Sequence, residues 1–178
     1  MKIRIGLLAL VLAATFAAAE EPSTFQDPLL DRFVGEWVLK GMIAGGDVTH
    51  DLSAAWVLGH QYLRFDEVSR ERDDKGEVAY EATVFIGWDE PSGRYVCMWL
   101  DITGGGGLNP KGFGYAKPSS EKLALVWKAD DGSSWHTTFA YDPESDSWHL
   151  KMHGERDGKR RPFADAKMTR RKRDTGGE

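Results

Sequence analysis

Ten short runs rich in Val, Ile, Thr, Phe, Tyr and Trp follow one another along most of this 178-residue chain. Segments rich in Gly, Pro, Asp and Ser separate the runs, and this alternation is typical of β-strands joined by tight turns. No sustained helical period interrupts the series. The sequence therefore predicts an all-β fold, with strands over residues 35–44, 48–58, 62–70, 78–88, 95–103, 111–117, 122–129, 134–141, 147–156 and 161–170.

Turn signals between the runs favour sequential antiparallel hairpins. Asp-Asp-Lys-Gly at residues 73–76 and Asp-Asp-Gly at residues 130–132 supply the positive φ angles and Asx turns that tight hairpins need. An up-and-down meander of about ten strands removes its exposed edges best by closing into a barrel. Before the first strand, Asp27 as N-cap and Pro28 in the first helical position predict one short helix over residues 28–34.

The first residues follow the plan of a secretory signal peptide. Lys2 and Arg4 give a positive start, residues 5–14 form an apolar run, and three alanines at residues 17–19 offer a small-residue cleavage site. The apolar run is too short to span a bilayer, and no stop-transfer pattern follows it. We therefore expect cleavage after residue 19 and a periplasmic or secreted product with no membrane span.

The single cysteine, Cys97, lies far downstream of this cleavage site, which argues against a lipoprotein. One cysteine also excludes an intramolecular disulfide. Because Cys97 lies within an apolar run, we expect a buried, unreactive thiol. The predicted layout is a signal peptide over residues 1–19, a polar lead over 20–27, a single barrel domain over 28–172 and a flexible tail over 173–178.

Charge is distributed unevenly along the chain. The formal charge of −5 becomes −7 once a signal peptide containing Lys2 and Arg4 is removed, yet residues 156–173 carry nine basic and two acidic side chains. The simplest interpretation of this basic segment is a solvated final hairpin and tail. The alternative is an interaction module that contacts an anionic surface. An exported, globally acidic protein without a recognised motif is a poor candidate for nucleic-acid binding.

The hairpin over residues 134–156 indicates which side chains face the interior. If Tyr141 pairs with Trp148, then Trp135, Phe139 and Tyr141 share one face of the sheet with Trp148. The need to bury this aromatic set fixes the register. The opposite face is then polar and points outward.

The same register places His136 directly opposite His153 on the polar face, with His149 two pairs away. Cross-strand Cβ atoms lie about 5 Å apart, close enough for two imidazoles to share a metal ion. One hypothesis is therefore a zinc or copper site formed by His136, His149 and His153. The simpler interpretation is a polar outer face that contains histidine, because the sequence places no carboxylate or thiolate beside them. His50 and His60 have no such partner.

Seven tryptophans are spread over separate strands, so several must approach one another when the sheet closes. Some build a core, and a barrel can also keep part of its interior open and lined by aromatic side chains. A small hydrophobic or amphipathic ligand in such a cavity is the leading hypothesis. The residues that we expect to line the cavity are Trp37, Trp56, Trp99, Trp127, Trp135, Phe139 and Tyr141.

Signals of catalysis are weak, and an enzymatic role is not favoured. Glycine-rich residues 104–112 precede a strand instead of a helix, which indicates a rim loop that acts as a lid and not a phosphate cradle. No nucleophile elbow, zinc-protease helix or Cys-x-x-Cys pair occurs. Asp66, Glu81 and Asp101 are candidates for an interior carboxylate, but nothing fixes two acids at a working separation. The sequence does not identify a cofactor, and it leaves the oligomeric state open.

Gly-Glu-Trp at residues 35–37 resembles the Gly-x-Trp opening of lipocalins and other calycins. Together with residues 56–63, 87–89, 95–101 and 167–171, the order of motifs is similar to that of the bacterial domain of unknown function 1579 family, over roughly residues 28–172. The resemblance implies a lipocalin-like or nitrobindin-like barrel in which Trp37 packs across the closed end. It implies no particular ligand or activity.

Overall fold

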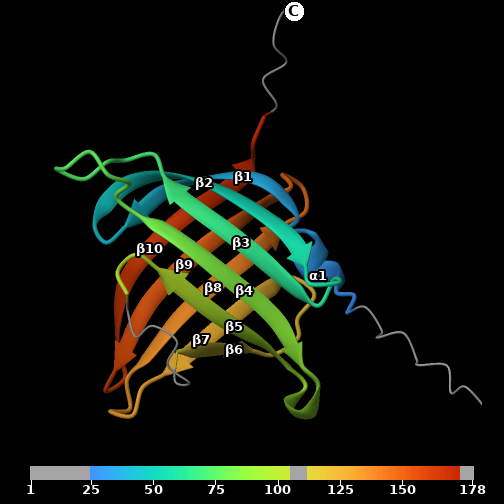
Figure 1. The fold of residues 1–178 in the computed structure, drawn as a ribbon. Helices are drawn as coiled ribbons and strands as arrows, with labels where there is room; N and C mark the ends of the chain where they lie inside the picture. The colour runs from blue at the N-terminus through green and yellow to red at the C-terminus, as the bar shows by residue number, and fades with distance from the viewer. Residues whose placement is uncertain (1–24, 105–111, 173–178) are drawn as a thin grey trace, which may run out of the picture.

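Ten antiparallel strands form a closed β-barrel (Figure 1). The computed structural model describes residues 25–104 and 112–172. Strands that are neighbours in the chain are neighbours in the sheet, and β1 (Gly35–Ile43) pairs with β10 (Lys159–Arg170) to close it. The other strands are β2 (Gly46–Val57), β3 (Tyr62–Ser69), β4 (Glu81–Asp89), β5 (Arg94–Asp101), β6 (Phe113–Ala116), β7 (Lys122–Lys128), β8 (Ser134–Asp142) and β9 (Ser147–Arg156).

The predicted all-β, up-and-down barrel with one short helix is confirmed by this architecture. A short 3₁₀ helix, η1 (Glu90–Ser92), lies in the connection between β4 and β5. The predicted signal peptide, the first part of the polar lead, the centre of the glycine-rich loop and the C-terminal tail lie outside the described residues. Within the described residues, no helix is long and apolar enough to cross a membrane.

Five strand starts, those of β2, β4, β5, β6 and β10, differ from the prediction by one to three residues. The differences at β4 and β10 have identifiable causes. Strand β4 begins at Glu81, because Val78 instead forms an isolated bridge with Arg72 within the β3–β4 connection. Strand β10 begins at Lys159 and continues past Pro162, where the register shifts and the strand bulges. A bulge accommodates proline because proline has no N–H to donate to the ladder.

The register predicted for the β8–β9 hairpin is confirmed. Tyr141 pairs with Trp148, and His136 pairs with His153. The interior-facing Phe139 is buried, as are Thr137, Trp148 and Leu150 on the same face of the hairpin. Alternation of side chains with a period of two therefore assigned the faces of this hairpin correctly.

Helix α1 (Pro28–Asp31) is a single turn, shorter than the predicted segment. Asp27 caps it as expected, because its Oδ1 accepts hydrogen bonds from two backbone N–H groups, each at 2.9 Å. After the helix, the N–H of Phe33 bonds to the carbonyl of Leu30 at 3.0 Å, the tighter spacing of a 3₁₀ turn. Gly35, at φ 127°, then turns the chain into β1.

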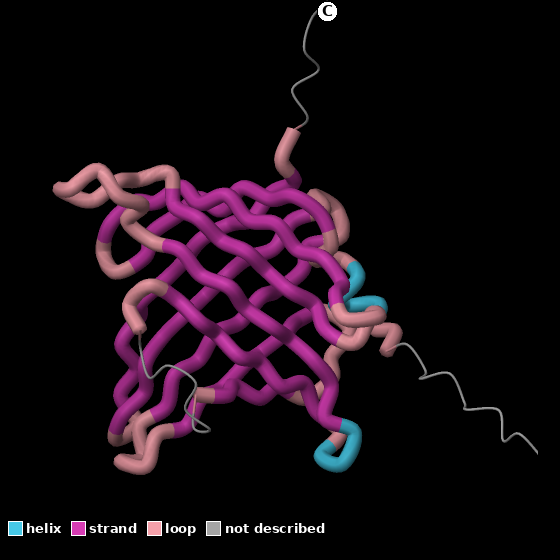
Figure 2. The backbone as a smooth tube through the Cα atoms, viewed as in Figure 1, coloured by secondary structure: helices cyan, strands magenta, loops and turns pink. Residues whose placement is uncertain are grey.

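Helix α1 lies beside one end of the barrel (Figures 1 and 2). Aromatic side chains close this end. The rings of Phe33 and Trp148 stack with centroids 3.6 Å apart and an interplanar angle of 4°. Trp37 is fully buried beside them and donates a 2.6 Å hydrogen bond from its Nε1 to the Phe33 carbonyl. The turns that join β1 to β2, β3 to β4, β7 to β8 and β9 to β10 lie at the opposite end.

Candidate functional site

A cavity of about 590 Å³ occupies the half of the barrel that lies away from α1. Its wall is largely apolar and combines aromatic rings with aliphatic side chains such as Met152. The rings that line it are Tyr80, Trp99, Trp127, Trp135 and Phe163. We call this space the barrel cavity.

Edge-to-face contacts position the tryptophans of the barrel cavity, and a glycine leaves room for one of them. Trp99 and Trp127 meet at a centroid distance of 6.5 Å and an angle of 77°, and Trp135 contacts Phe163 at 4.9 Å and 70°. Such pairs add to the stabilisation from burial alone. The Trp127 indole lies where a Cβ at position 114 would be, so Gly114 is needed for this packing.

Of the seven aromatic residues predicted as ligand contacts, three line the barrel cavity and four do not. Trp99, Trp127 and Trp135 line the barrel cavity. Phe139 lies deeper, beside a small gap next to Phe65. Trp37 belongs to the closed end.

Trp56 and Tyr141 lie near the α1 end, away from the barrel cavity. Trp56 donates from its Nε1 to Asp31 at 2.8 Å and stacks on His60 at 4.2 Å. Tyr141 lies beneath the guanidinium of Arg32, 4.7 Å from its ring centroid. Both side chains therefore hold the segment around α1 against the barrel.

A buried imidazole–carboxylate pair lies in the wall of the barrel cavity. Nδ1 of His50 on β2 lies 2.5 Å from Oε1 of Glu67 on β3, and the two residues are 3% and 6% exposed. His50 has no evident partner in the sequence, and Glu67 was not among the predicted site residues. The signal was present, because Glu67 shares the interior face of β3 with Leu63 and Phe65.

The interior carboxylates differ from those suggested by the sequence. Asp66 points away from the interior, where it pairs with Arg64 at 2.9 Å, and Glu81 is exposed. Asp101 does line the barrel cavity. The prediction for Asp66 was wrong by one residue. Consecutive side chains of a strand point to opposite faces of the sheet, so Glu67 faces the interior and Asp66 faces outward.

Tyr80 connects the His50–Glu67 pair to Asp101. Its ring lies nearly parallel to the His50 imidazole, with centroids 5.5 Å apart. Its hydroxyl accepts a hydrogen bond from Trp99 Nε1 at 2.9 Å and donates to Asp101 Oδ2 at 3.4 Å. Burial raises the pKa of the Tyr80 hydroxyl, as does the nearby charge of Glu67, so the phenol stays protonated and remains a donor.

Two polar atoms of the barrel cavity have no hydrogen-bond partner within the described residues. They are Oγ1 of Thr137, a residue that is fully buried, and Oε2 of Glu71. The other carboxylate oxygen of Glu71 accepts a 2.8 Å bond from the N–H of Thr49. Buried polar atoms are normally satisfied, so these two unpartnered oxygens in the cavity wall are exceptions.

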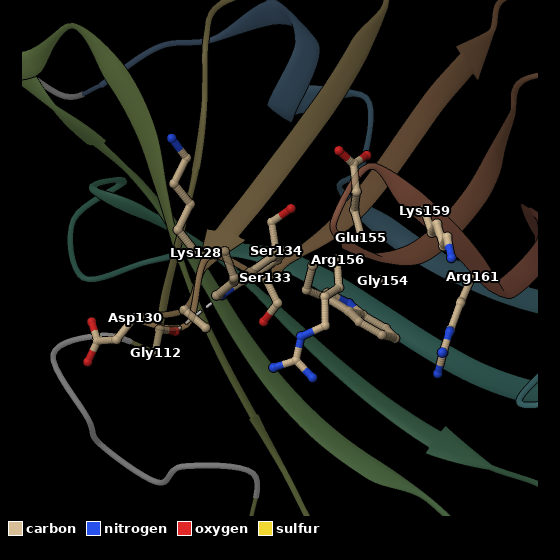
Figure 3. A pocket seen from close by; sticks show the side chains of 13 residues that line it. Gly112, Lys128, Asp130, Ser133, Ser134, Gly154, Glu155, Arg156, Lys159 and Arg161 are labelled. Carbon is tan, nitrogen blue, oxygen red and sulfur yellow. Dashed lines mark hydrogen bonds between the residues drawn. The ribbon is translucent and has the colours of Figure 1, made fainter.

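A basic groove of about 690 Å³ lies outside the cavity, along the open rim (Figure 3). Lys128 lies on one side of it, and Arg156, Lys159 and Arg161 come from the β9–β10 hairpin. The groove shares Trp127 and Trp135 with the barrel cavity, so these two indoles form the partition between them.

Ion pairs partly neutralise the basic C-terminal segment. Each of four arginines in it contacts a carboxylate of the barrel, and this reduces the positive charge that the segment presents to a partner. The finding favours the solvated-face interpretation over the interaction module. The pairs are Arg156–Asp131, Arg160–Glu155, Arg170–Asp146 and Arg171–Asp51.

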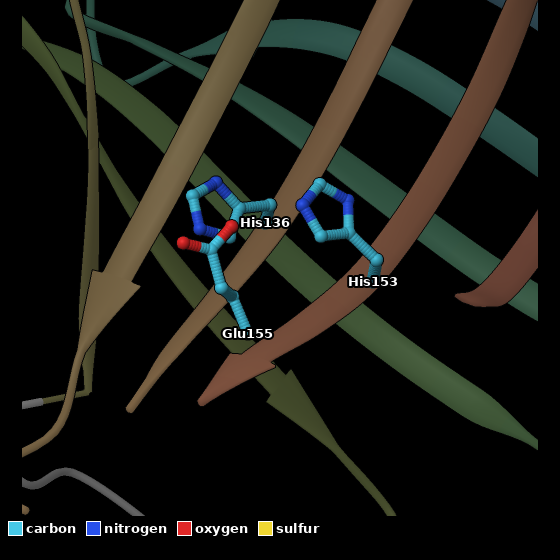
Figure 4. A group of neighbouring side chains, drawn as sticks. All are labelled: His136, His153 and Glu155. Carbon is cyan, nitrogen blue, oxygen red and sulfur yellow. The ribbon is translucent and has the colours of Figure 1, made fainter. Parts of the chain in front are cut away.

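His136 and His153 come together on the outer face of the β8–β9 hairpin (Figure 4). Their rings are parallel with centroids 4.5 Å apart, and Glu155 joins them so that one ligand atom from each residue lies within 4.8 Å of the others. His149 lies apart from this cluster, with its Nε2 2.5 Å from Oδ1 of Asp165. The expectation that no carboxylate lies beside these histidines is therefore wrong, because Glu155 does. The sequence contained a signal for this, since His153 and Glu155 are two residues apart on one strand and share a face.

Hydrogen bonds hold part of this His–His–Glu cluster. Nε2 of His136 lies 2.8 Å from Ser134 Oγ, and Glu155 accepts a 2.9 Å bond from Nε of Arg160. Nε2 of His153 is buried and has no partner within the described residues. Burial lowers the pKa of His153, and the neighbouring His136 lowers it further, so the neutral, metal-binding form is favoured.

Cys97 is buried and free, as the sequence predicted, and burial raises the pKa of its thiol. A protonated, enclosed thiol does not act as a nucleophile.

Comparison with protein-family models finds no match for this chain, and a search among curated proteins also finds none. We therefore infer function from the geometry of the barrel cavity and of the His–His–Glu cluster.

Proposed function

We propose that this protein binds a small hydrophobic or amphipathic molecule in the barrel cavity. The observation that carries the proposal is a cavity of about 590 Å³ with an aromatic wall and a few buried polar groups. Small-molecule sites have volumes of about 300–1,000 Å³ and combine an apolar lining with few orienting polar groups. Closure of the α1 end leaves the opposite rim as the entrance.

The cavity is a specific feature and not merely an unfilled core. Trp99 and Trp127 present large apolar surfaces to it while their Nε1 atoms bond to Tyr80 and to the Gly112 carbonyl. A ligand can therefore bury apolar area against these rings without leaving an indole N–H unsatisfied. This arrangement supports ligand binding as the role of the interior.

Binding of the neutral fluorescent probe N-phenyl-1-naphthylamine tests the proposal. The protein should raise the probe fluorescence saturably, and the cavity-filling change Met152→Trp should reduce the affinity at least about tenfold. Lys151→Trp is the matched control, because Lys151 is exposed on the other face of the same strand. Equal affinity in both variants would show that the probe does not use the cavity.

We also propose that the protein is exported and that it belongs to the domain of unknown function 1579 family of lipocalin-like barrels. Export is supported by the positive, apolar and small-residue segments within residues 1–19. Family membership is supported by the order of sequence motifs and by the closed barrel in which they lie. The mature N-terminus of protein recovered from a periplasmic extract tests the first point.

A second candidate function is metal binding at the His–His–Glu cluster. The supporting observation is that ligand atoms of His136, His153 and Glu155 lie within 4.8 Å of one another, a set that suits Zn²⁺. Metal analysis of untagged protein after dialysis against zinc tests it. One equivalent should be retained, and it should be lost in the double change His136→Ala, His153→Ala.

His149→Ala is the matched control for this experiment, because His149 lies on the same face but outside the cluster. It should leave zinc retention unchanged. Retention by the double variant, or no retention by the unmodified protein, would rule out the site.

A further inference from the structure

We propose that the ligand of the barrel cavity is a cationic amphiphile: an apolar body, aromatic or aliphatic, that carries an ammonium group. The inference rests on the proposed binding function and adds the charge of the ligand to it. It follows from the charges, the ring faces and the unpartnered atoms that the cavity presents together. None of these alone identifies the ligand.

The charged groups of the cavity wall are nearly all acidic. Glu67, Glu71 and Asp101 line it, and none of the described lining residues is Lys or Arg. His50 is the single basic group, and its Nδ1 is engaged with Glu67. Carboxylates in an enclosed site of low dielectric are costly without a counter-charge, so a cation in the ligand is favoured and an anion is opposed.

The aromatic wall also suits a cation. The Trp99 and Trp127 N–H groups are already bonded within the protein, so what these indoles offer to the cavity is ring surface. An ammonium group within about 6 Å of an indole face is attracted by the ring quadrupole, more strongly when water is excluded. The same faces accommodate the apolar part of the ligand.

The unsatisfied polar atoms of the cavity are oxygens that can accept hydrogen bonds. Thr137 is fully buried and its Oγ1 lacks a partner, as does Oε2 of Glu71. The Tyr80 hydroxyl proton is already directed to Asp101. The Glu71 carboxylate can only accept hydrogen bonds, and the Thr137 hydroxyl can accept as well as donate. An ammonium group carries only donors and can therefore bond to both, whereas a fatty acid or phosphate would bring further acceptors beside Glu71.

Three naphthalene probes of similar size test the charge preference by calorimetry at pH 7.4: 1-naphthylmethylamine, 1-naphthalenemethanol and 1-naphthaleneacetate, the anion of 1-naphthaleneacetic acid. We expect the ammonium probe to bind at least about tenfold more tightly than the neutral alcohol, and the carboxylate to bind most weakly. Glu67→Gln, which keeps an oxygen to bond His50, should remove most of the preference. Asp101→Asn provides a second variant that does not alter the buried His50–Glu67 pair.

Glu81→Gln is the matched control, since Glu81 is exposed and does not line the cavity. It should keep the full preference for the ammonium probe. Equal binding of the alcohol and the amine, or a preference that survives in both carboxylate variants, would overturn the inference while leaving the binding function intact. If none of the three probes nor N-phenyl-1-naphthylamine binds, the proposed function itself fails.

Discussion

The guanidinium of Arg170 lies over the indole of Trp37, with its Cζ atom 3.8 Å from the ring centroid. The same guanidinium donates to the carbonyls of Val34 at 2.6 Å and Arg32 at 3.0 Å, and its Nε donates to Asp146 at 2.9 Å. One side chain at the end of β10 thus joins the segment after α1, the start of β1 and the β8–β9 turn. Arg170 therefore stabilises the closed end of the barrel.

Arg170→Ala should lower the free energy of unfolding by about 2 kcal/mol, because it removes the ring contact and the hydrogen bonds to two backbone carbonyls and to Asp146. Arg170→Lys should recover only part of the loss, since an ammonium cannot reproduce the planar fork. Urea unfolding followed by circular dichroism measures both. Arg161→Ala, at an exposed arginine of the same strand, should change stability by less than about 0.5 kcal/mol. Equal effects at the two positions would contradict this account of the closed end.

Tyr95→Phe should weaken the attachment of α1 to the barrel. The Tyr95 hydroxyl donates to Oδ2 of Asp27, the residue that caps the helix. Burial raises the pKa of this hydroxyl, as does the carboxylate of Asp27, so the proton stays on the phenol. We expect a loss of about 1 kcal/mol and faster amide exchange in α1. Tyr115→Phe, which affects a tyrosine stacked under Arg94, is the control and should leave exchange in α1 unaltered.

Thr137→Val should stabilise the ligand-free protein by about 1 kcal/mol, because it replaces a buried, unpartnered hydroxyl by a methyl group of the same shape. Thermal unfolding of dialysed protein measures the effect. Thr138→Val, on the outward face of the same strand, should be nearly neutral. A clear destabilisation by Thr137→Val would mean that the hydroxyl is satisfied in solution.

The barrel could be predicted because its determinants are local. Side-chain alternation and turn residues identify each hairpin, and at Tyr141 and Trp148 they also fix the register. The start of β4 was missed because Val78 has strand composition, yet its pairing with Arg72 closes a separate small loop. Composition cannot distinguish these two kinds of pairing.

The cavity site was less predictable because it depends on contacts between strands. The side chains of His50 and Glu67 meet only through the register of β2 against β3, which sets His50 opposite Ser69 and Leu52 opposite Glu67. The shape of the cavity depends on how side chains of many strands share the interior. Glu155 was within reach of sequence reasoning, since it lies two residues after His153 on the same face.

The stability of the protein should fall as the pH drops below about 6.5, and His153 should contribute to the fall. Burial lowers the pKa of His153 below its ordinary value of 6.5, and His136 and Arg160 lower it further, while Glu155 acts in the opposite sense. As the pH falls below 6.5 the unfolded chain binds a proton at this residue before the folded chain does. Protonation therefore favours unfolding until the pH has passed the lower, folded pKa.

Urea midpoints at pH 7.5, 6.5 and 5.5, measured with a chelator present, should decrease less in His153→Gln than in the unmodified protein. His149→Gln is the comparison, because His149 is exposed beside Asp165 and should retain the decrease. An identical pH dependence in the unmodified protein and in His153→Gln would show that the folded chain protonates His153 as readily as the unfolded chain. Zinc binding at the His–His–Glu cluster requires a neutral His153 imidazole, and the structure would then give no support for that neutral form. The zinc-retention experiment and the urea experiment therefore both depend on the protonation of His153.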